Sequence, residues 1–289
     1  MSAGAGVPAG AAPGAVNYLD RIVPSVVRRL EERKRNIPQA EIEADPGPGP
    51  RPSFSEALRA QGVSLIAEVK RASPSKGPIR PGLEVGPLVQ AFETAGARAL
   101  SVLTEEDQFA GSLGDLRAAV AATGLPVLRK DFILDEYQLY EARAAGASAV
   151  LLIAALLPDE LLVPLAGLAA DLGLDVLLEV HDAHEMSRAL ALDGVIIGVN
   201  NRDLRTFTVS LQTTVELAGL VPSGRLLVGE SGVWTHTDVE RLAAAGVDGV
   251  LVGESLLRHP DVETAVRELM HPVPAVTPRT TRQVWTREA

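Results

Sequence analysis

Short apolar runs recur at regular spacing from residue 64 onwards, and each is followed by a stretch whose apolar residues return every three or four positions. The first pattern predicts buried strands, and the second, clear at 135–145 and 235–245, predicts helices that cover them. Strands that are apolar on both faces are typical of parallel sheets. The predicted strands are SLIAEV (64–69), ALSVL (99–103), PVLRK (126–130), AVLLIA (149–154), DVLLEV (175–180), GVIIGVN (194–200), RLLVGE (225–230) and DGVLVG (248–253).

The number of these strand–helix units favours one architecture. Eight units in a chain of 289 residues favour a closed (β/α)8 barrel over an open doubly wound sheet. Weak internal sequence similarity supports the repeat. The segments AGARALSVL, AGASAVLLI and AGVDGVLVG each carry a helix-ending glycine, at positions 96, 146 and 246, before the next strand. The sequence therefore predicts an α/β fold of the TIM-barrel class.

An extra helix is expected before the barrel. Between residues 17 and 35 apolar side chains recur at helical spacing, and the segment ends in a basic run. The linker DPGPGPRP (45–52) follows, because alternating Pro and Gly supports neither helix nor strand. The predicted organisation is a disordered leader (1–16), the extra helix and linker (17–52), the barrel (53–270) and a disordered tail (271–289).

Composition and charge exclude several classes of partner. A net charge of −10 argues against nucleic acid or an anionic membrane surface as the main partner. The chain has no cysteine, which leaves no disulfide framework or thiolate nucleophile and favours a cytoplasmic location. The most apolar stretch, 148–170, is interrupted by Pro158, Asp159, Glu160 and Pro164. It is interpreted as a strand and a helix rather than a membrane span.

Polar side chains gather where the predicted strands end, which in such barrels is where chemistry occurs. Alternate residues of a strand share a face, so Glu68 and Lys70 lie on the same face as the apolar Ile66. Taken singly, such a residue is more often a solvated rim residue or half of a structural ion pair. Together they predict a site that can shift pKa values towards proton transfer. The same parity, with one neighbouring loop residue, adds Lys130, Glu179, Asn200, Glu230 and Arg202.

Two histidines follow the fifth predicted strand, in HDAH (181–184). Asp182 is well placed to cap the next helix, and no further ligand cluster is visible. His181 and His184 are therefore expected to hold no metal and to have no special role.

Two glycine-bearing turns open predicted helices after the seventh and eighth strands, GESGVWTHTD (229–238) and GESLLRHP (253–260). Barrels of this kind usually bind a phosphate at these turns, through backbone N–H groups at helix N-termini. The alternative is that glycine merely permits a tight turn. Glu254 is compatible with a phosphate site if its side chain points away and the donors are main-chain groups.

The chain resembles the indole-3-glycerol phosphate synthase family in long motifs at successive strand ends, in family order. The N-terminal YLDRIV with its basic helix is similar to the family's extra helix. The motifs are IAEVKRASPSKG (66–77), LSVLTEEDQFAGSLGDL (100–116), PVLRKDFILDEYQLYEARAAGASAVLLI (126–153), LLEVHD (177–182), IGVNNRDLRTF (197–207), VGESGV (228–233) and GVLVGESLL (249–257).

The resemblance implies ring closure of 1-(2-carboxyphenylamino)-1-deoxyribulose 5-phosphate to indole-3-glycerol phosphate, with loss of carbon dioxide and water and with no cofactor or metal. It implies that Lys130 is the general acid and Glu179 the later acid/base of dehydration. Lys70, on a mobile loop, would bind the substrate carboxylate or phosphate, while Glu68 and Asn200 would orient these groups and the sugar hydroxyls.

The same resemblance implies the residues that contact substrate. Arg202 would hold the anthranilate side and Ser73 is a candidate contact on the first loop. The apolar walls would be Phe109, Phe132 and Leu204; Glu230 and Ser231 would line the site; and the phosphate cradle would be Ser231, Gly232, Gly253 and Glu254. The implied partner is a small phosphosugar–anthranilate substrate. A monomer is expected, with other enzymes of tryptophan biosynthesis as candidate protein partners.

The chemistry of ring closure sets an expectation for the lysines. An acid must stand beside the carbonyl oxygen, and a lysine whose pKa is lowered by burial or by a neighbouring ammonium is suitable, so Lys70 and Lys130 are expected to lower one another. A phosphoribosylanthranilate isomerase or an epimerase barrel would share the phosphate turns but not this set of side chains. A non-catalytic descendant would be expected to lack at least one acid or base.

Overall fold

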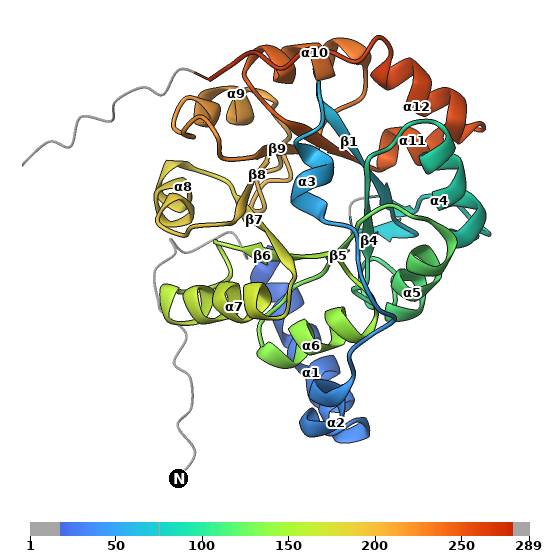
Figure 1. Cartoon of the computed structure of the whole chain (residues 1–289), viewed down its shortest axis with the longest axis vertical. Coiled ribbons are helices and arrows are strands. Elements are labelled where there is room, and N and C mark those ends of the chain that lie inside the picture. The colour runs from blue at the N-terminus through green and yellow to red at the C-terminus, as the bar shows by residue number, and fades with distance from the viewer. Residues whose placement is uncertain (1–17, 75, 280–289) are drawn as a thin grey trace, which may run out of the picture.

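The computed structural model describes residues 18–74 and 76–279, and within this part of the chain eight parallel strands close into a barrel (Figure 1). The strand order is β1-β10-β9-β8-β7-β6-β5-β4, and β4 pairs with β1 to complete the circle. This confirms the predicted TIM barrel. The strands are β1 Ser64–Val69, β4 Ala99–Leu103, β5 Val127–Lys130, β6 Ala149–Ile153, β7 Asp175–Val180, β8 Ile196–Asn200, β9 Leu227–Glu230 and β10 Gly249–Val252.

Helices surround the strands, and each predicted strand–helix unit is present (Figure 1). Asp135 and Thr235, the first residues of the two helices predicted from periodicity, accept a backbone N–H as N-caps rather than beginning the helix. The outer helices are α4 Val85–Thr94, α5 Leu113–Ala122, α6 Glu136–Ala144, α7 Asp159–Asp171, α8 Ala183–Leu190, α9 Gln212–Ala218, α10 His236–Ala244, α11 Glu254–Arg258 and α12 Val262–Met270.

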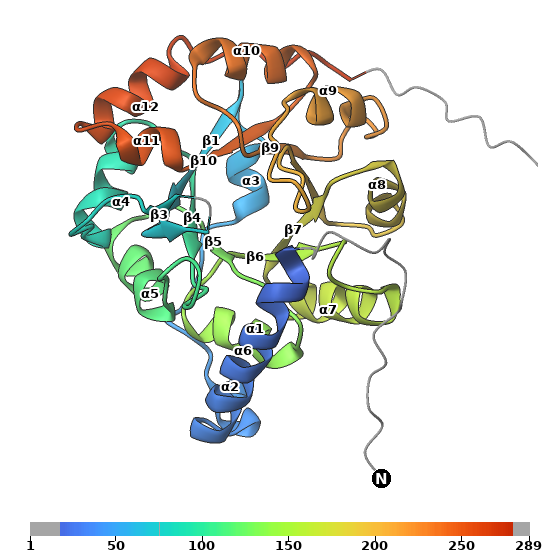
Figure 2. The same ribbon diagram turned by 180° about the vertical axis from the view of Figure 1, so that it is seen from behind.

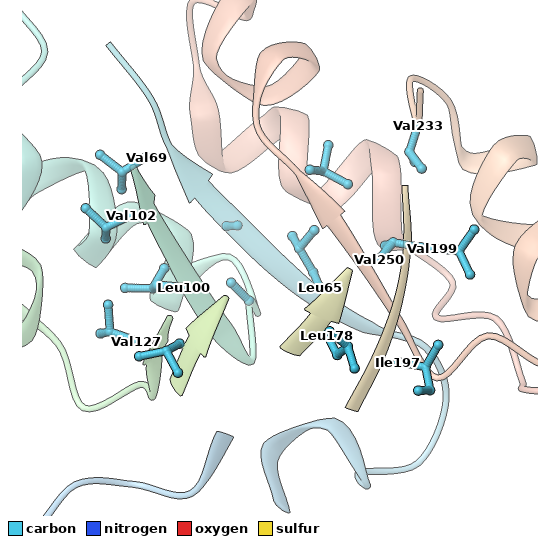
Figure 3. Packing of buried hydrophobic residues seen from close by; sticks show 14 of the residues in the cluster. Leu65, Val69, Leu100, Val102, Val127, Leu178, Ile197, Val199, Val233 and Val250 are labelled. Atoms are coloured by element: carbon cyan, nitrogen blue, oxygen red, sulfur yellow. The ribbon is translucent and has the colours of Figure 1, made fainter. Parts of the chain in front are cut away.

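Two apolar cores follow from the alternation of side chains along the strands. Between strands and helices lies a large aliphatic core that includes Leu65, Val69 and Leu100 (Figure 3). Inside the barrel lies a second core, which contains Ile66, Leu128 and the corresponding residues of other strands. Because Ile66 points inward, Glu68 and Lys70 continue its inward face at the end of β1, as the parity argument predicts.

A helix covers each end of the barrel interior. At the amino-terminal end of the strands, Phe54 and Leu58 of α3 (Phe54–Leu58) are buried in the inner core. On the opposite side, Ile22 and Val26 of α1 (Tyr18–Asn36) join the same core, and Figure 2 shows α1 lying over the rim beside α6. The extra N-terminal helix therefore helps to enclose the end of the barrel where the strands finish.

The segments outside the barrel differ in part from the sequence-based expectation. A short helix, α2 (Gln39–Ala44), precedes the linker and buries Ile42 against Tyr137 of α6. Residues 45–52 contain no helix or strand. Leader residues 1–16 and tail residues 280–289 lie outside the described part of the chain. No described helix combines the length and apolar character needed to cross a membrane.

The first nine residues of the predicted disordered tail, 271–279, lie along the barrel in this structure. The Val63 N–H donates to the Pro274 carbonyl at 3.0 Å, and the Thr277 N–H donates to the Ala243 carbonyl at 3.0 Å. Arg279 Nη1 lies 3.0 Å from Asp248 Oδ2, and its guanidinium also donates to main-chain carbonyls of Gly246 and Arg225. Composition suggested disorder, but one buried arginine supplies specific contacts that composition does not reveal.

Arg279→Ala is expected to lower the free energy of unfolding by about 1–3 kcal/mol, because the Asp248 carboxylate and buried carbonyls lose a charged donor. The measurement is urea unfolding followed by circular dichroism. The matched control is Arg267→Ala, which breaks an exposed ion pair with Glu263 and should change stability by about 0.5 kcal/mol or less. Equal stability of the two variants would contradict a specific role for Arg279.

Candidate active site

A cavity of about 420 Å³ opens where the strands end, and each residue proposed above for catalysis or substrate binding lines it. Strands β1, β5, β7, β8 and β9 contribute Glu68, Lys130, Glu179, Asn200 and Glu230 as their penultimate or last residues. The segments after β1, β4, β5, β8, β9 and β10 contribute Lys70, Ser73, Phe109, Phe132, Arg202, Leu204, Ser231, Gly232, Gly253 and Glu254. The closed barrel thus brings together side chains that are more than 180 residues apart in sequence.

An ionic cluster occupies the floor of this cavity. Lys130 Nζ lies 3.0 Å from Glu179 Oε2 and 3.4 Å from Glu230 Oε2. Lys70 Nζ lies 2.5 Å from Glu68 Oε1, and Asn200 Nδ2 donates to Glu179 Oε1 at 3.1 Å. The three glutamates are almost completely buried. Buried carboxylates are costly unless paired, so the two ammonium groups and the amide are what allow them to remain there.

The pKa of Lys130 differs from the sequence-based expectation. Burial acts to lower this pKa, as expected, but the carboxylates of Glu179, Glu230 and Glu68 raise it well above its usual range. The prediction of a lowered pKa is therefore wrong: the nearest groups are carboxylates rather than another ammonium. Lys130 remains protonated throughout the working pH range, with its proton held between Glu179 and Glu230.

The two carboxylates beside Lys130 have different proton affinities. Burial acts to raise the pKa of Glu179, but Lys130, His181 and Asn200 hold it well below its usual range. Burial raises the pKa of Glu230 to about 7; Lys130 opposes this, and the negative charge of Glu179 adds to it. Glu179 is therefore a permanent carboxylate, whereas Glu230 exchanges a proton near neutral pH. A pair of carboxyl groups separated in this way is typical of acid–base sites.

A glycine on β8 makes room for this arrangement. A Cβ atom at Gly198 would lie 2.2 Å from Glu230 Oε1, far inside van der Waals contact. Glu230 Oε1 is buried and has no hydrogen-bond partner within the described residues. The strand backbone at Gly198 therefore approaches this oxygen closely, and any other residue at position 198 would displace the Glu230 carboxylate.

The two glycine-bearing turns face the cavity from adjacent strands. Ser231 and Gly232 follow β9 with positive φ values of 63° and 82°, and Gly253 follows β10 as the N-cap of α11. A non-glycine residue at positive φ is strained by about 1 kcal/mol, and such strain is typical of ligand-binding turns. Glu254 Oε1 lies 2.9 Å from Arg258 Nη2, so its carboxylate is directed along the helix and paired. These turns could hold an anion through main-chain N–H groups.

An apolar wall stands opposite the turns. The rings of Phe109 and Phe132 are 6.3 Å apart and Leu204 packs in the same cluster. Tyr18, at the start of α1, lines the cavity too, 6.4 Å from Phe132 and 5.4 Å from Phe207. Its hydroxyl is buried with no hydrogen-bond partner among the described residues. Sequence reasoning identified the helix but missed Tyr18, although the aromatic residue stands in the YLDRIV motif that marks it.

His181, for which the sequence predicts no special role, lies between two carboxylates. Its Nε2 lies 3.3 Å from Glu179 Oε1, and its Nδ1 lies 3.0 Å from Glu185 Oε2. The parity of β7, which places Leu177, Glu179 and His181 on one face, was the available signal. His184 is exposed, and within the described residues no group of histidines and carboxylates is arranged to hold a metal ion.

The strand that carries Lys130 has a second cation directly before it. Arg129 is buried on the opposite face of β5, where Nη2 lies 2.8 Å from Asp131 and 3.2 Å from Glu141. Glu141 also lies 2.7 Å from Arg33 of α1. One face of β5 therefore serves the cavity, and the other ties the strand to α6 and α1.

Comparisons with known proteins agree with this arrangement. The family model described as indole-3-glycerol phosphate synthase matches residues 19–269. A relative from Ralstonia nicotianae, indole-3-glycerol phosphate synthase 2, is 49% identical over 207 residues, which are 72% of this chain and 77% of the relative.

Solved structures with low sequence identity show the fold alone. A mutant tryptophan synthase alpha-subunit from Pyrococcus furiosus has a TM-score of 0.56 and 15% identity, covering 72% of this chain and 98% of its own. Thiamine phosphate pyrophosphorylase from the same organism has a TM-score of 0.56 and 18% identity, covering 73% and 95%. The family match spans both the barrel and the helix before it, and with the 49% identical relative it shows that the chain belongs to the indole-3-glycerol phosphate synthase family of carboxy-lyases in tryptophan biosynthesis.

Proposed function

We propose that the cavity closes the indole ring of 1-(2-carboxyphenylamino)-1-deoxyribulose 5-phosphate, releasing carbon dioxide and water and giving indole-3-glycerol phosphate. The observation that carries this proposal is the Lys130 ammonium, held between a permanent carboxylate and a carboxyl group that titrates near neutral pH. Family membership supplies the substrate, and this cluster supplies the acid and base that the chemistry needs.

The cavity has a polar end and an apolar end that suit the two halves of the substrate. The phosphate would bind at Ser231, Gly232 and Gly253, where main-chain donors are available. The anthranilate ring would lie against Phe109 and Phe132, with Arg202 near its carboxylate. This orientation would put the ribulose carbonyl between the two ends, near Lys130.

Lys130 would act first. As the aromatic carbon attacks the ribulose carbonyl, negative charge develops on the oxygen, and the Lys130 ammonium donates a proton to it. A lysine with a raised pKa is a weak acid in general, but it is always in the protonated form, and the alkoxide that forms is a stronger base than an amine. Glu230, 3.4 Å away, could return the proton between steps.

Lys70 would assist the loss of carbon dioxide. The electron pair of the broken carbon–carboxylate bond restores the aromatic ring, so the carboxylate must be bound without being stabilised too strongly. Lys70 suits this task because Glu68, 2.5 Å away, already neutralises part of its charge. It extends from the end of β1 into the cavity.

Glu179 would act last. The intermediate loses its hydroxyl group as water: the Lys130 ammonium, reprotonated by Glu230, donates the proton that the departing hydroxyl group needs, while Glu179 removes a proton from the neighbouring carbon. Its depressed pKa guarantees the basic form, and the hydrogen bond from Asn200 fixes its orientation. Glu68 and Asn200 would also contact sugar hydroxyl groups from opposite sides of the cavity.

Incubation of the purified protein with this substrate is expected to produce indole fluorescence. Release of one carbon dioxide per indole formed distinguishes the complete reaction from partial turnover. A lack of signal at high enzyme concentration would overturn the proposal.

We also propose that the protein acts as a monomer in the cytoplasm, because each residue of the proposed mechanism comes from one barrel and the chain has no cysteine. Light scattering should give a mass near the 30.4 kDa of one chain. If other enzymes of tryptophan biosynthesis bind the protein, adding them to the sample should raise the mass that light scattering measures.

A further inference from the structure

His181 bridges the carboxylate proposed as the last base to a second carboxylate outside the barrel. Its Nε2 lies 3.3 Å from Glu179 Oε1, and its Nδ1 lies 3.0 Å from Glu185 Oε2. The same Glu185 oxygen accepts the His181 backbone N–H at 2.8 Å. Glu185 thus holds both the ring and the main chain of His181, which fixes the direction in which the imidazole faces Glu179.

Both ring nitrogens face carboxylate oxygens, and this decides the charge of the ring. A neutral imidazole has only one N–H, so it would direct a lone pair at one of the two carboxylates. Burial acts to lower the pKa of His181, but Glu179 and Glu185 raise it to about 10. The other charged groups around this ring are Asp182 beside it and, across a neighbouring cavity, Arg202, Asp203 and Arg205.

His181 stands between two cavities. It lines a second, outer cavity together with Glu185, Asn201 and Asp203, whereas Glu179 lines the inner one. Asn200, Arg202 and Leu204 border both. The side chain is largely buried, with 13% of it exposed, so water reaches it from the outer cavity without displacing substrate.

The contacts of Glu179 are divided between its two oxygens. Asn200 and His181 both lie at Oε1, and Lys130 lies at Oε2. The hydrogen bond from Asn200 fixes Oε1, and His181 Nε2 faces the same atom as an ion pair without hydrogen-bond geometry, so Oε2 is the oxygen left for Lys130 and the substrate. If the carboxyl group rotated freely, its two oxygens would exchange places, and neither would be kept facing Lys130 and the substrate.

We propose that His181 is a positioning residue that acts as an imidazolium: it holds the Oε1 atom of Glu179 in place and keeps this carboxylate ionised under acidic conditions. The inference rests on the proposed role of Glu179 as a base. It adds a residue just past the end of β7, which lines a separate cavity, to a mechanism otherwise confined to the first cavity.

The test is the pH profile of kcat/KM for His181→Gln, which keeps an N–H donor near the position of Nε2 but removes the positive charge. Without that charge the pKa of Glu179 rises, so the acidic limb should move to higher pH by about one unit. Activity should fall by up to about tenfold on the acidic limb itself, near pH 4 and below, and change about twofold or less between pH 6 and pH 8. His184→Gln, an exposed neighbour, is the matched control and should leave the profile unchanged.

A second measurement does not depend on the His181 variant folding. Nitrogen-15 NMR of the wild-type histidines should show one imidazolium that persists above pH 8, and Glu185→Gln should lower its pKa. A purely structural role predicts reduced thermal stability of His181→Gln with an unshifted profile, and that result would overturn the inference. Wild-type enzyme without synthase activity would instead contradict the proposed function, so the two failures are distinguishable.

Discussion

Lys130→Met is expected to lower kcat by about 10²- to 10⁴-fold, the usual contribution of a positioned general acid. Methionine fills a similar volume but cannot donate a proton, and it leaves Glu179 and Glu230 without their shared cation. Carbon dioxide release in a single turnover should fall with the same factor as indole formation, because the block precedes decarboxylation.

The control for this variant is Lys34→Met. Lys34 lies 2.8 Å from Asp135 and so forms a lysine–carboxylate pair of similar geometry outside the cavity. Its rate should remain within about twofold of wild type, because this partly exposed pair lies outside the cavity and contacts no residue of the proposed mechanism. Near-wild-type turnover of Lys130→Met would show that another group supplies the proton.

Glu179→Gln is expected to lower kcat by a similar factor of about 10² to 10⁴, but at a later step. The amide keeps the shape of the side chain and loses its basicity. Because Glu179 is proposed to act only after decarboxylation, a single turnover should release carbon dioxide at a rate that exceeds indole formation. Trapped carbon dioxide and indole fluorescence, measured on the same sample, give the two rates.

Glu240→Gln makes the same chemical change on the exposed side of α10 and should leave both rates unchanged. Equal loss of carbon dioxide release and indole formation in Glu179→Gln would move the role of this residue to ring closure. Full activity would remove it from the mechanism altogether.

Strand parity in the sequence was sufficient to predict the barrel and the cavity. On β1, β5, β7 and β9 the inward-facing residues change from apolar to ionic at the end of the strand, as from Ile66 to Glu68. A parallel barrel brings these strand ends together, whatever the conformation of the loops. Strand boundaries differ by up to two residues, because ladder pairing rather than apolar character decides where a strand begins and ends.

The properties that could not be predicted depend on contacts between residues that are distant in sequence or belong to different elements. The pKa of Lys130 follows from Glu179 and Glu230, which lie on other strands, so parity identifies the members of the cluster but not their pairing. The contacts of His181 were not predicted, because its partner Glu185 lies four residues further on and belongs to no recognised motif. Arg279 lies in a segment of disordered composition and is fixed by Asp248, which only the folded barrel presents.

The adjacent cations of β5 have a consequence for how insertions and deletions are tolerated. Arg129 faces the buried carboxylates of Asp131 and Glu141, and Lys130 faces those of Glu179 and Glu230. Slipping the strand by one residue reverses every side chain, so the planar guanidinium would enter the reaction chamber and the ammonium would enter the structural network. Net charge would be conserved on both sides, yet the fork-shaped contacts of one and the proton transfer of the other would be lost together. An insertion or deletion that shifts this four-residue strand by one position would therefore impair folding and catalysis together.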